Sequence, residues 1–441
     1  MKKVYREAPV GSDSLTIDPK VAEHRFGRRL PWPKRVDIAL LCFAAVVISH
    51  CDRINISVAA PFVMKERHWD TAQMGWVLSG FFLGYTAFMV LTGYLADRFG
   101  PKLVFGASVV WWSIFTALTP IPNTIIGMAL VRCLMGVGES GTNPCTNSIL
   151  VRWFPPYEYS RATSLAFGGA YLGPILALPL SAAIANRWGW QSMFYVFAIF
   201  GFIWLPFWML GSYNRPESTH SISQQELDKI LTARPEIQEA GALPWQRIMT
   251  CPAFWAVAIL HFSGNWIYYM LATWLPTYLI SVRGFSLTSM AIGSALPFLS
   301  AWVGLQLFGT LVDLSVRRYE RTRVRKLFLI PFAGSALALL MVPHASGQGS
   351  IILLLCLASL LLTSISPTLN SGSLEIAPRY AGSFMGFQNT VGNLAGILVP
   401  VVVGGLAKNY GWNVTFWSAL GISAGGIAVY SLFGRAEKLI D

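Results

Sequence analysis

The sequence predicts an all-α membrane protein with twelve transmembrane helices in two six-helix, pseudo-symmetric bundles and with both termini in the cytoplasm. Four observations lead to this prediction. The 441 residues are 54% hydrophobic and only 12% charged, with a mean hydropathy of +0.51. Apolar runs of about 20 residues, long enough to cross a bilayer as a helix, recur along the chain. Basic residues alternate in density between successive loops, and two sequence patterns occur once in each half.

The apolar runs divide the chain into five segments. Residues 1–35 are polar and basic, and they lack the short apolar core of a signal peptide, so we expect a cytoplasmic tail. The N-terminal bundle covers 36–211, with spans at roughly 36–62, 73–96, 102–120, 124–150, 162–186 and 190–211. A cytoplasmic linker at 212–250 holds a short amphipathic helix near Ser223–Leu231. The C-terminal bundle covers 251–434, with spans at roughly 253–281, 287–313, 326–345, 350–373, 380–406 and 411–433, before a tail at 435–441.

Lysine and arginine predict the orientation. With both ends inside, the tails and inner loops hold most of the 33 basic residues. The outer loops hold few, namely Lys65, Arg67, Arg187, Arg283 and Lys408. Cytoplasmic loops are enriched in these residues, which places the termini inside. The same rule accounts for the net charge of +12, so we expect no nucleic-acid partner.

An internal repeat supports the two bundles. Gly93, Leu95 and Asp97 follow the second predicted span and recur as Gly309, Leu311 and Asp313 after the eighth. A second pattern, Gly189-Trp190-Gln191 with Phe194, is echoed by Gly411-Trp412-Asn413 with Phe416. Two matches in register at span boundaries predict a parallel duplication, which is typical of secondary transporters with a site at the bilayer midplane.

The fourth predicted span carries two charges at membrane depth, Arg132 and Glu139, which lie seven residues apart and therefore on one helix face. A charge at the bilayer centre costs roughly 2.5–3.5 kcal/mol on insertion scales, so it must pair or face a polar cavity. Gly136, Gly138 and Gly141 leave this helix little bulk and suit close packing.

Several motifs resemble those of a known family. The run Gly93–Lys102 resembles the signature loop of the major facilitator superfamily. Within it, the chain is similar to the anion:cation symporters, which include sialin-like, vesicular-glutamate-like and bacterial sugar-acid transporters. The supporting pieces are Asp52-Arg53-Ile54-Asn55, the stretch from Arg132 to Pro144, Tyr268-Tyr269, the run Thr273–Leu279, the run Glu375–Gly382 and Asn389-Thr390.

The resemblance implies an alternating-access transporter for an organic anion such as a sugar acid, coupled to protons or sodium. It places a functional acid at Glu139. In sugar-acid members we expect a glutamine in the fifth helix just before an aromatic residue, and here Ala170 stands before Tyr171. This difference weakens the case for a simple hexonate substrate.

Four charged residues are the central candidates. Asp52 and Arg53 lie in the first span, and Arg132 and Glu139 lie in the fourth. Arginine binds carboxylates bidentately and stays charged, so Arg53 and Arg132 are the expected substrate anchors. A buried carboxylate can take up a proton near neutral pH, so Asp52 and Glu139 are the expected proton-coupling residues. Protonating them would free the arginines for the substrate; the alternative is an Arg132–Glu139 pair that only locks helices.

Further polar residues complete the predicted site. Tyr85 in the second span, Tyr268 and Tyr269 in the seventh, and Asn389 and Asn393 in the eleventh are expected to contact substrate, with helix packing as the alternative for each. Asp97, Arg98 and Asp313 are expected to act as conformational gates at the cytoplasmic end. His50 lies near Asp52 and is a candidate for tuning it.

The remaining expectations concern partners and rival functions. The six cysteines show no disulfide or metal spacing, and no nucleophile motif or phosphate-binding loop occurs, so we expect no enzyme, metal or cofactor, with H⁺ as the coupling ion. We expect a monomer in contact with membrane lipids, in the plasma membrane of a bacterium. The alternatives are an inorganic-phosphate or sodium-coupled carrier and, from another class, a membrane receptor or enzyme without transport.

Overall fold

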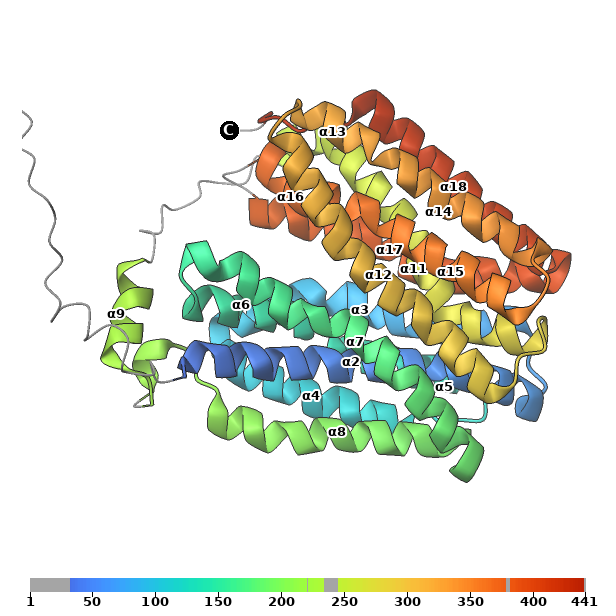
Figure 1. The fold of residues 1–441 in the computed structure, drawn as a ribbon. Coiled ribbons are helices and arrows are strands. Elements are labelled where there is room, and N and C mark those ends of the chain that lie inside the picture. The colour runs from blue at the N-terminus through green and yellow to red at the C-terminus, as the bar shows by residue number, and fades with distance from the viewer. Residues whose placement is uncertain (1–31, 220, 234–244, 378–380, 440–441) are drawn as a thin grey trace, which may run out of the picture.

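Two groups of helices face each other in the structure, a computed structural model that describes residues 32–219, 221–233, 245–377 and 381–439 (Figure 1). The first group contains α2 (Lys34–Arg67), α3 (Thr71–Phe99), α4 (Pro101–Leu118), α5 (Ile125–Glu139), α6 (Thr142–Trp153), α7 (Pro156–Trp188) and α8 (Trp190–Gly211). The second contains α11 (Pro252–Ser281), α12 (Leu287–Val316), α13 (Arg321–Leu327), α14 (Leu329–Met341), α15 (Gln348–Leu362), α16 (Ser366–Ile376), α17 (Ala381–Tyr410) and α18 (Trp412–Phe433). No strand occurs in the described residues, which confirms the all-α prediction.

Ten helical segments of the described chain are long and apolar enough to cross a membrane. The other two predicted spans are the continuous helices α2, with 34 residues, and α11, with 30. Charged residues in α2 and many polar and aromatic residues in α11 lower their hydropathy, because these helices line the centre of the molecule. The number twelve and the cytoplasmic position of the termini therefore stay predictions.

Two predicted spans are interrupted. The fourth is divided at Ser140 and Gly141 into α5 and α6, where Gly141 and Pro144 weaken the helical ladder. The tenth is divided by a 3₁₀ turn at Thr363–Ile365 between α15 and α16. Pro367 follows that turn and cannot donate to the preceding helix. Both interruptions lie within the apolar runs, where periodicity alone does not reveal them.

The internal repeat is visible in the backbone. Gly189 joins α7 to α8 with φ 85° and ψ 160°, and Gly411 joins α17 to α18 with φ 81° and ψ 170°. A residue with a side chain rarely adopts this region, so glycine is required at both junctions. Equivalent helix pairs of the two halves thus turn in the same way, in agreement with the predicted duplication.

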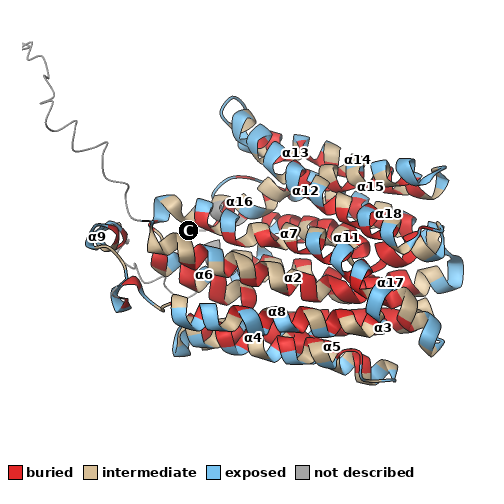
Figure 2. Ribbon diagram, turned by 60° about the horizontal axis from the view of Figure 1, so that its bottom comes forward, coloured by how far each residue is buried: buried red, intermediate tan, exposed pale blue. Residues whose placement is uncertain are grey.

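Glycines bring α3 and α5 into backbone contact. A Cβ added to Gly84 would overlap the carbonyl oxygen of Cys133, and one added to Gly136 would overlap that of Phe81. This close approach of small residues is the usual way in which membrane helices associate. It also holds the face of α5 that carries Arg132 and Glu139 against α3. Buried residues run along the facing sides of both halves, and exposed ones lie on their outer faces (Figure 2).

The halves diverge at the end that holds the first turn of α2, here named the inner end, and meet at the opposite, outer end where α3 begins (Figure 1). Polar contacts join them at the outer end. Thr71 Oγ1 donates to the carbonyl of Gly404 at 2.8 Å, and Ser79 Oγ donates to that of Ile397 at 2.7 Å. Lys408 Nζ pairs with Asp70 at 2.9 Å. These contacts close the outer end along the line where α3 crosses α17.

The linker helix α9 (Gln224–Thr232) is attached to the first half, and it begins after its N-cap Ser223, close to the predicted position. Its Glu226 carboxylate accepts hydrogen bonds from the backbone N–H groups of Lys34 and Arg35, at 3.0 and 3.1 Å, and pairs with the Arg35 guanidinium at 2.8 Å. Arg35 also pairs with Glu158 at 3.0 Å. Because a carboxylate stabilises a helix N-terminus, Glu226 caps α2 from a distant part of the chain.

Asp70 has two roles that can be separated by mutation. Its side chain caps α3 by accepting from the N–H of Gln73, and it pairs with Lys408. Asp70→Asn keeps a good cap but removes the ion pair, which at a partly exposed site contributes about 0.2–1 kcal/mol. We expect a larger outer-end opening, measured as a longer distance between spin labels on Ile121 and Tyr410. An unchanged distance distribution would show that the pair does not hold the outer end.

The pH dependence of this contact follows from Asp70. Partial burial alone would raise its pKa, but the hydrogen bond and charge of Lys408 and the N–H of Gln73 outweigh burial and hold the pKa below its usual value. A depressed pKa means that the pair is complete above the ordinary carboxyl range and is lost only as the pH falls through the folded value. The same label distance should therefore stay constant from about pH 5 to pH 8. A transition within that range would contradict this assignment.

Candidate functional site

An ion pair lies at the centre of the first half. Arg53, on α2, donates through Nε to Oε1 of Glu139 on α5 at 2.9 Å, and its Nη2 contacts the same oxygen. Glu139 is fully buried, whereas Arg53 reaches the boundary with the second half, where Tyr268 and Tyr269 lie next to it. The pairing differs from the alternative we considered, because Glu139 bonds Arg53 and not Arg132.

Arg132 is held by the main chain. Its Nη1 and Nη2 lie 3.5 and 3.4 Å from the carbonyl oxygens of Asp52 and Arg53. Its guanidinium carbon lies 5.2 Å from the centre of the Phe81 ring, within cation–π range. Only 1% of Arg132 is exposed. The structure therefore brings all four predicted charges together but gives the two arginines different surroundings.

Asp52 lacks a charged partner within contact distance. Both of its oxygens are buried and have no hydrogen-bond partner among the described residues, and the same holds for Oε2 of Glu139 and Nε of Arg132. The indole N–H of Trp112 is likewise buried and without a partner among the described residues. An isolated ionised carboxylate in an apolar interior is very costly. A group in this position is therefore suited to binding a proton.

His50 does not bond to Asp52 in the described contacts. Its Nδ1 lies 2.9 Å from the carbonyl oxygen of Val46 and 3.2 Å from Oγ of Ser49. These contacts stay within α2, and one ring face lines the central cavity. The geometry thus gives His50 a hydrogen bond within its own helix and does not support the predicted tuning of Asp52 through direct contact.

Tyr85 covers the arginine from α3. Its ring centre lies 4.8 Å from the Arg53 guanidinium carbon, and the ring stacks on Phe81 at 5.8 Å. Its hydroxyl oxygen accepts a hydrogen bond from Nδ2 of Asn143, on α6, at 3.0 Å. Asn143 is not among the site residues predicted above. An amide in an apolar run next to Pro144 was the available signal.

The second half contributes neutral polar groups. Tyr269, on α11, donates its hydroxyl to Oδ1 of Asn393 at 2.6 Å. Nδ2 of Asn393 donates to the carbonyl of Asn389, one turn earlier on α17, at 2.9 Å. Tyr268 packs on Tyr269 and Phe298 and also lines the cavity. The five predicted polar contacts therefore all lie near the boundary between the halves.

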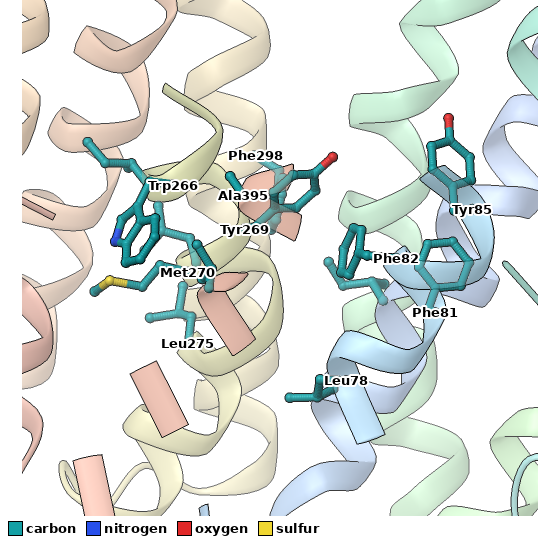
Figure 3. Packing of buried hydrophobic residues seen from close by; sticks show 14 of the residues in the cluster. Leu78, Phe81, Phe82, Tyr85, Trp266, Tyr269, Met270, Leu275, Phe298 and Ala395 are labelled. Atoms are coloured by element: carbon teal, nitrogen blue, oxygen red, sulfur yellow. The ribbon is translucent and has the colours of Figure 1, made fainter. Parts of the chain in front are cut away.

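Phe82 and Tyr269 form a barrier across this boundary. Their ring centres are 4.6 Å apart, and they come from opposite halves (Figure 3). Gly396 of α17 makes room for Phe82, because a Cβ there would overlap its ring. A cavity of about 20 Å³, enough for about one water molecule, lies beside Arg53 and Arg132 and extends toward the outer end at Leu78. The barrier thus separates the outer end from the inner side.

The predicted gate residues lie away from this centre. Asp97 is exposed at the inner end, 3.8 Å from Arg152. Arg98 donates to the hydroxyl of Tyr94 at 3.1 Å, and Asp313 is exposed. Of the motif run Glu375–Gly382, Glu375 pairs with Arg325 at 2.8 Å, and Pro378, Arg379 and Tyr380 lie outside the described residues.

The chain is similar to known proteins over most of its length. The family model described as "Major Facilitator Superfamily" matches residues 42–400. The chain is 34% identical to "Ascorbate transporter, chloroplastic" of Arabidopsis thaliana, covering 99% of this chain and 82% of that protein. It is 34% identical to "Sodium-dependent phosphate transport protein 1, chloroplastic" of the same plant, covering 93% and 82%. It is 32% identical to sialin of Ovis aries, covering 91% and 90%.

A solved structure shows the same fold. A bacterial homologue of the human lysosomal transporter Spinster, in an inward-facing and unoccupied conformation, superposes with a TM-score of 0.77. The sequences are 17% identical, and the match covers 93% of this chain and 98% of that one. At this identity the likeness concerns the fold alone.

The barrier can be tested through the glycine that accommodates it. Gly396→Leu forces the Phe82 ring out of its position, and such overpacking costs about 1–3 kcal/mol. We expect the outer end to open, so that a cysteine introduced at Leu78 reacts faster with an impermeant maleimide applied from the outer end. Gly405→Leu on the same helix is the matched control, because a Cβ at Gly405 meets open space. Equal labelling rates in the two variants would contradict the barrier.

Proposed function

The chain belongs to the Major Facilitator Superfamily, a family of transporters and not of enzymes, and from this premise we propose that it takes up an organic anion together with protons by alternating access. The observation that carries the proposal is the position of Arg53. It is a permanent cation at membrane depth that faces the boundary between the halves and is held there by one buried carboxylate.

Arg53 is the proposed anion anchor. A guanidinium binds a carboxylate through two parallel hydrogen bonds, and Arg53 presents this group beside the Tyr85 ring. Arg132 supplies a second fixed positive charge, which is buried and whose Nη1 and Nη2 face backbone carbonyls. Arg132 therefore attracts the anion through its electrostatic field, and Arg53 makes the direct contact with the anion. Asn393, Asn389, Tyr268 and Tyr269 meet the rest of the substrate from the other half.

Glu139 is the proposed coupling residue. While ionised, it occupies the guanidinium that the substrate needs. Protonation weakens this pair, so a proton bound at Glu139 and an anion bound at Arg53 favour each other. Asp52 is the proposed second proton site, because its carboxylate is buried without a partner among the described residues. Competition for one arginine is thus the physical basis of coupling.

The contacts at the outer end indicate from which side of the membrane the site is reached in this conformation. In the described conformation hydrogen bonds between α3 and α17 join the halves at the outer end, and the halves diverge at the inner end (Figure 1). We propose that this is the inward-facing state and that the inner end is cytoplasmic. Asp97, Arg98 and Asp313 are exposed there and engage when the halves close at that end.

A sodium-coupled carrier of phosphate is the second candidate. Phosphate also binds paired arginines, and one relative is named as a sodium-dependent phosphate transport protein. In this case the unpartnered Asp52 oxygens would take Na⁺ in place of a proton. Ala170 leaves its helix without the amide expected for sugar acids, so the substrate panel must extend beyond hexonates.

The other expectations stay predictions. The protein is a multi-pass integral membrane protein. A bacterial plasma membrane, a monomeric state, the absence of a cofactor and contact with specific lipids are proposed from the sequence. The ascorbate and phosphate relatives are chloroplast proteins by name, so the location requires a direct test.

Glu139→Gln separates binding from coupling. Protein is reconstituted into liposomes with an internal pH dye, and hexonates, hexuronates, aldarates, tartrate, sialate, glutamate, ascorbate, phthalate and phosphate are added outside. We expect one organic anion to acidify the interior in the wild type. The variant should lose this acidification and uphill accumulation but keep exchange of labelled substrate, because Arg53 remains.

The control is Glu66→Gln, which alters a carboxylate at the outer end that accepts from the indole of Trp190. It should leave acidification unchanged. Uphill accumulation by Glu139→Gln would refute the coupling role of Glu139. Sodium-dependent phosphate uptake without acidification would establish the second candidate instead.

A further inference from the structure

The hydrogen bond between Asn143 and Tyr85 has a direction with chemical consequences. A tyrosine hydroxyl has one proton to donate and lone pairs that accept, whereas the nitrogen of an amide only donates. Nδ2 of Asn143 donates to the Tyr85 oxygen at 3.0 Å. The Tyr85 proton therefore cannot be used in this bond and must point elsewhere.

The surroundings of Tyr85 fix the ring and leave the proton available. Its ring stacks on Phe81, the Arg53 guanidinium carbon lies close to both rings, at 4.8 Å from the centre of Tyr85 and 5.0 Å from that of Phe81, and only 3% of Tyr85 is exposed. Among the described contacts, no acceptor takes the Tyr85 proton. The hydroxyl points from α3 toward the inner end, on the same side as the hydroxyl of Tyr269 (Figure 3). Arg53 and the free O–H thus lie side by side.

In the opposite half the hydrogen bond between tyrosine and asparagine runs the other way. Tyr269 donates its proton to Oδ1 of Asn393, so that proton is already used. Each half therefore holds one Tyr–Asn pair at the boundary, but only in the pair of the first half does the tyrosine proton stay unused. The donor lies on the half that also carries the arginines.

We propose that Asn143 is a positioning residue that directs the Tyr85 hydroxyl proton at the bound anion, so that Arg53 and Tyr85 form a donor-only site selective for the ionised form of the substrate. This inference rests on the proposed function. It adds Asn143 to the site and adds a preference for the ionised form of the substrate. Asn143 does not touch the anion in this arrangement. It acts by donating to the Tyr85 oxygen, so that the hydroxyl proton is left for the anion.

The test is a double-mutant cycle on the full-length protein in liposomes. The probe is the anion of the panel above that the wild type imports, and KM and Vmax are measured for Asn143→Ala, Tyr85→Phe and the double variant. A hydrogen bond to a charged group corresponds to about a tenfold change in affinity or more. We expect KM to rise about tenfold for Tyr85→Phe and severalfold for Asn143→Ala, with little change in Vmax. The double variant should match Tyr85→Phe, because Asn143 acts only through the hydroxyl.

Asn143→Asp tests the direction of the bond in nearly the same shape. Aspartate accepts and would take the Tyr85 proton, so KM should rise more than for Asn143→Ala. In the Tyr85→Phe background, the introduced carboxylate keeps only its charge repulsion, so the effect of Asn143→Asp should shrink. An unchanged KM for Asn143→Asp would mean that the native amide accepts from Tyr85, which overturns the proposal.

Asn147→Ala is the matched control. Asn147 lies one turn further along α6 and accepts from the hydroxyl of Tyr159 at 3.3 Å, so the variant also removes an amide–tyrosine bond from this helix. It should leave KM unchanged. Additive effects of Asn143→Ala and Tyr85→Phe, or an equal effect of Asn147→Ala, would show a merely structural role. A wild type that imports no anion of the panel would overturn the proposed function and this inference together, whereas an active wild type with normal Asn143 variants would overturn the inference alone.

Discussion

The pair between Arg53 and Glu139 is the constraint on which the centre of the structure depends. A guanidinium in the middle of a membrane needs a partner, and the long side chain of Arg53 on α2 reaches the carboxylate of Glu139 on α5. The glycines of α3 and α5 hold α5 against α3, since backbone atoms meet where side chains would overlap. Phe81 and Tyr85 then fill the remaining space with ring faces, which suit a cation better than aliphatic groups do.

The charged side chains of the central site are distributed unequally between the two halves. The charges at the central site lie on the first half, whereas the second contributes tyrosine hydroxyls and asparagine amides in the described residues. In the proposed cycle the anion and the proton both bind to groups of the first half, so the halves can move relative to each other without separating opposite charges at the central site. The inner linker helix is fixed to the charged half by Glu226, so it moves with that half.

The sequence was sufficient to predict the helical fold, most helix positions, the repeat and the residues that gather at the centre. Charges at membrane depth are costly, so their presence marks the site whatever the tertiary structure. The partners were not predictable, because Arg132 and Glu139 share a helix face while the pairing depends on how far α2 reaches toward α5. Asn143, Phe82 and Gly396 were missed for a related reason. A single amide, ring or glycine in an apolar run has no distinctive pattern until a second helix is placed against it.

The balance of charge in the central group has a consequence for membrane voltage. With all four groups ionised, Asp52 and Glu139 cancel Arg53 and Arg132, so the empty protein moves no net charge through the field when its halves rock. One proton on each acid leaves two positive charges, and a monovalent anion reduces this to one. Each net charge carried across the membrane responds to the potential by about 2.3 kcal/mol per 100 mV. In the proposed cycle, an inside-negative membrane therefore drives the loaded protein inward and leaves its empty return unaffected.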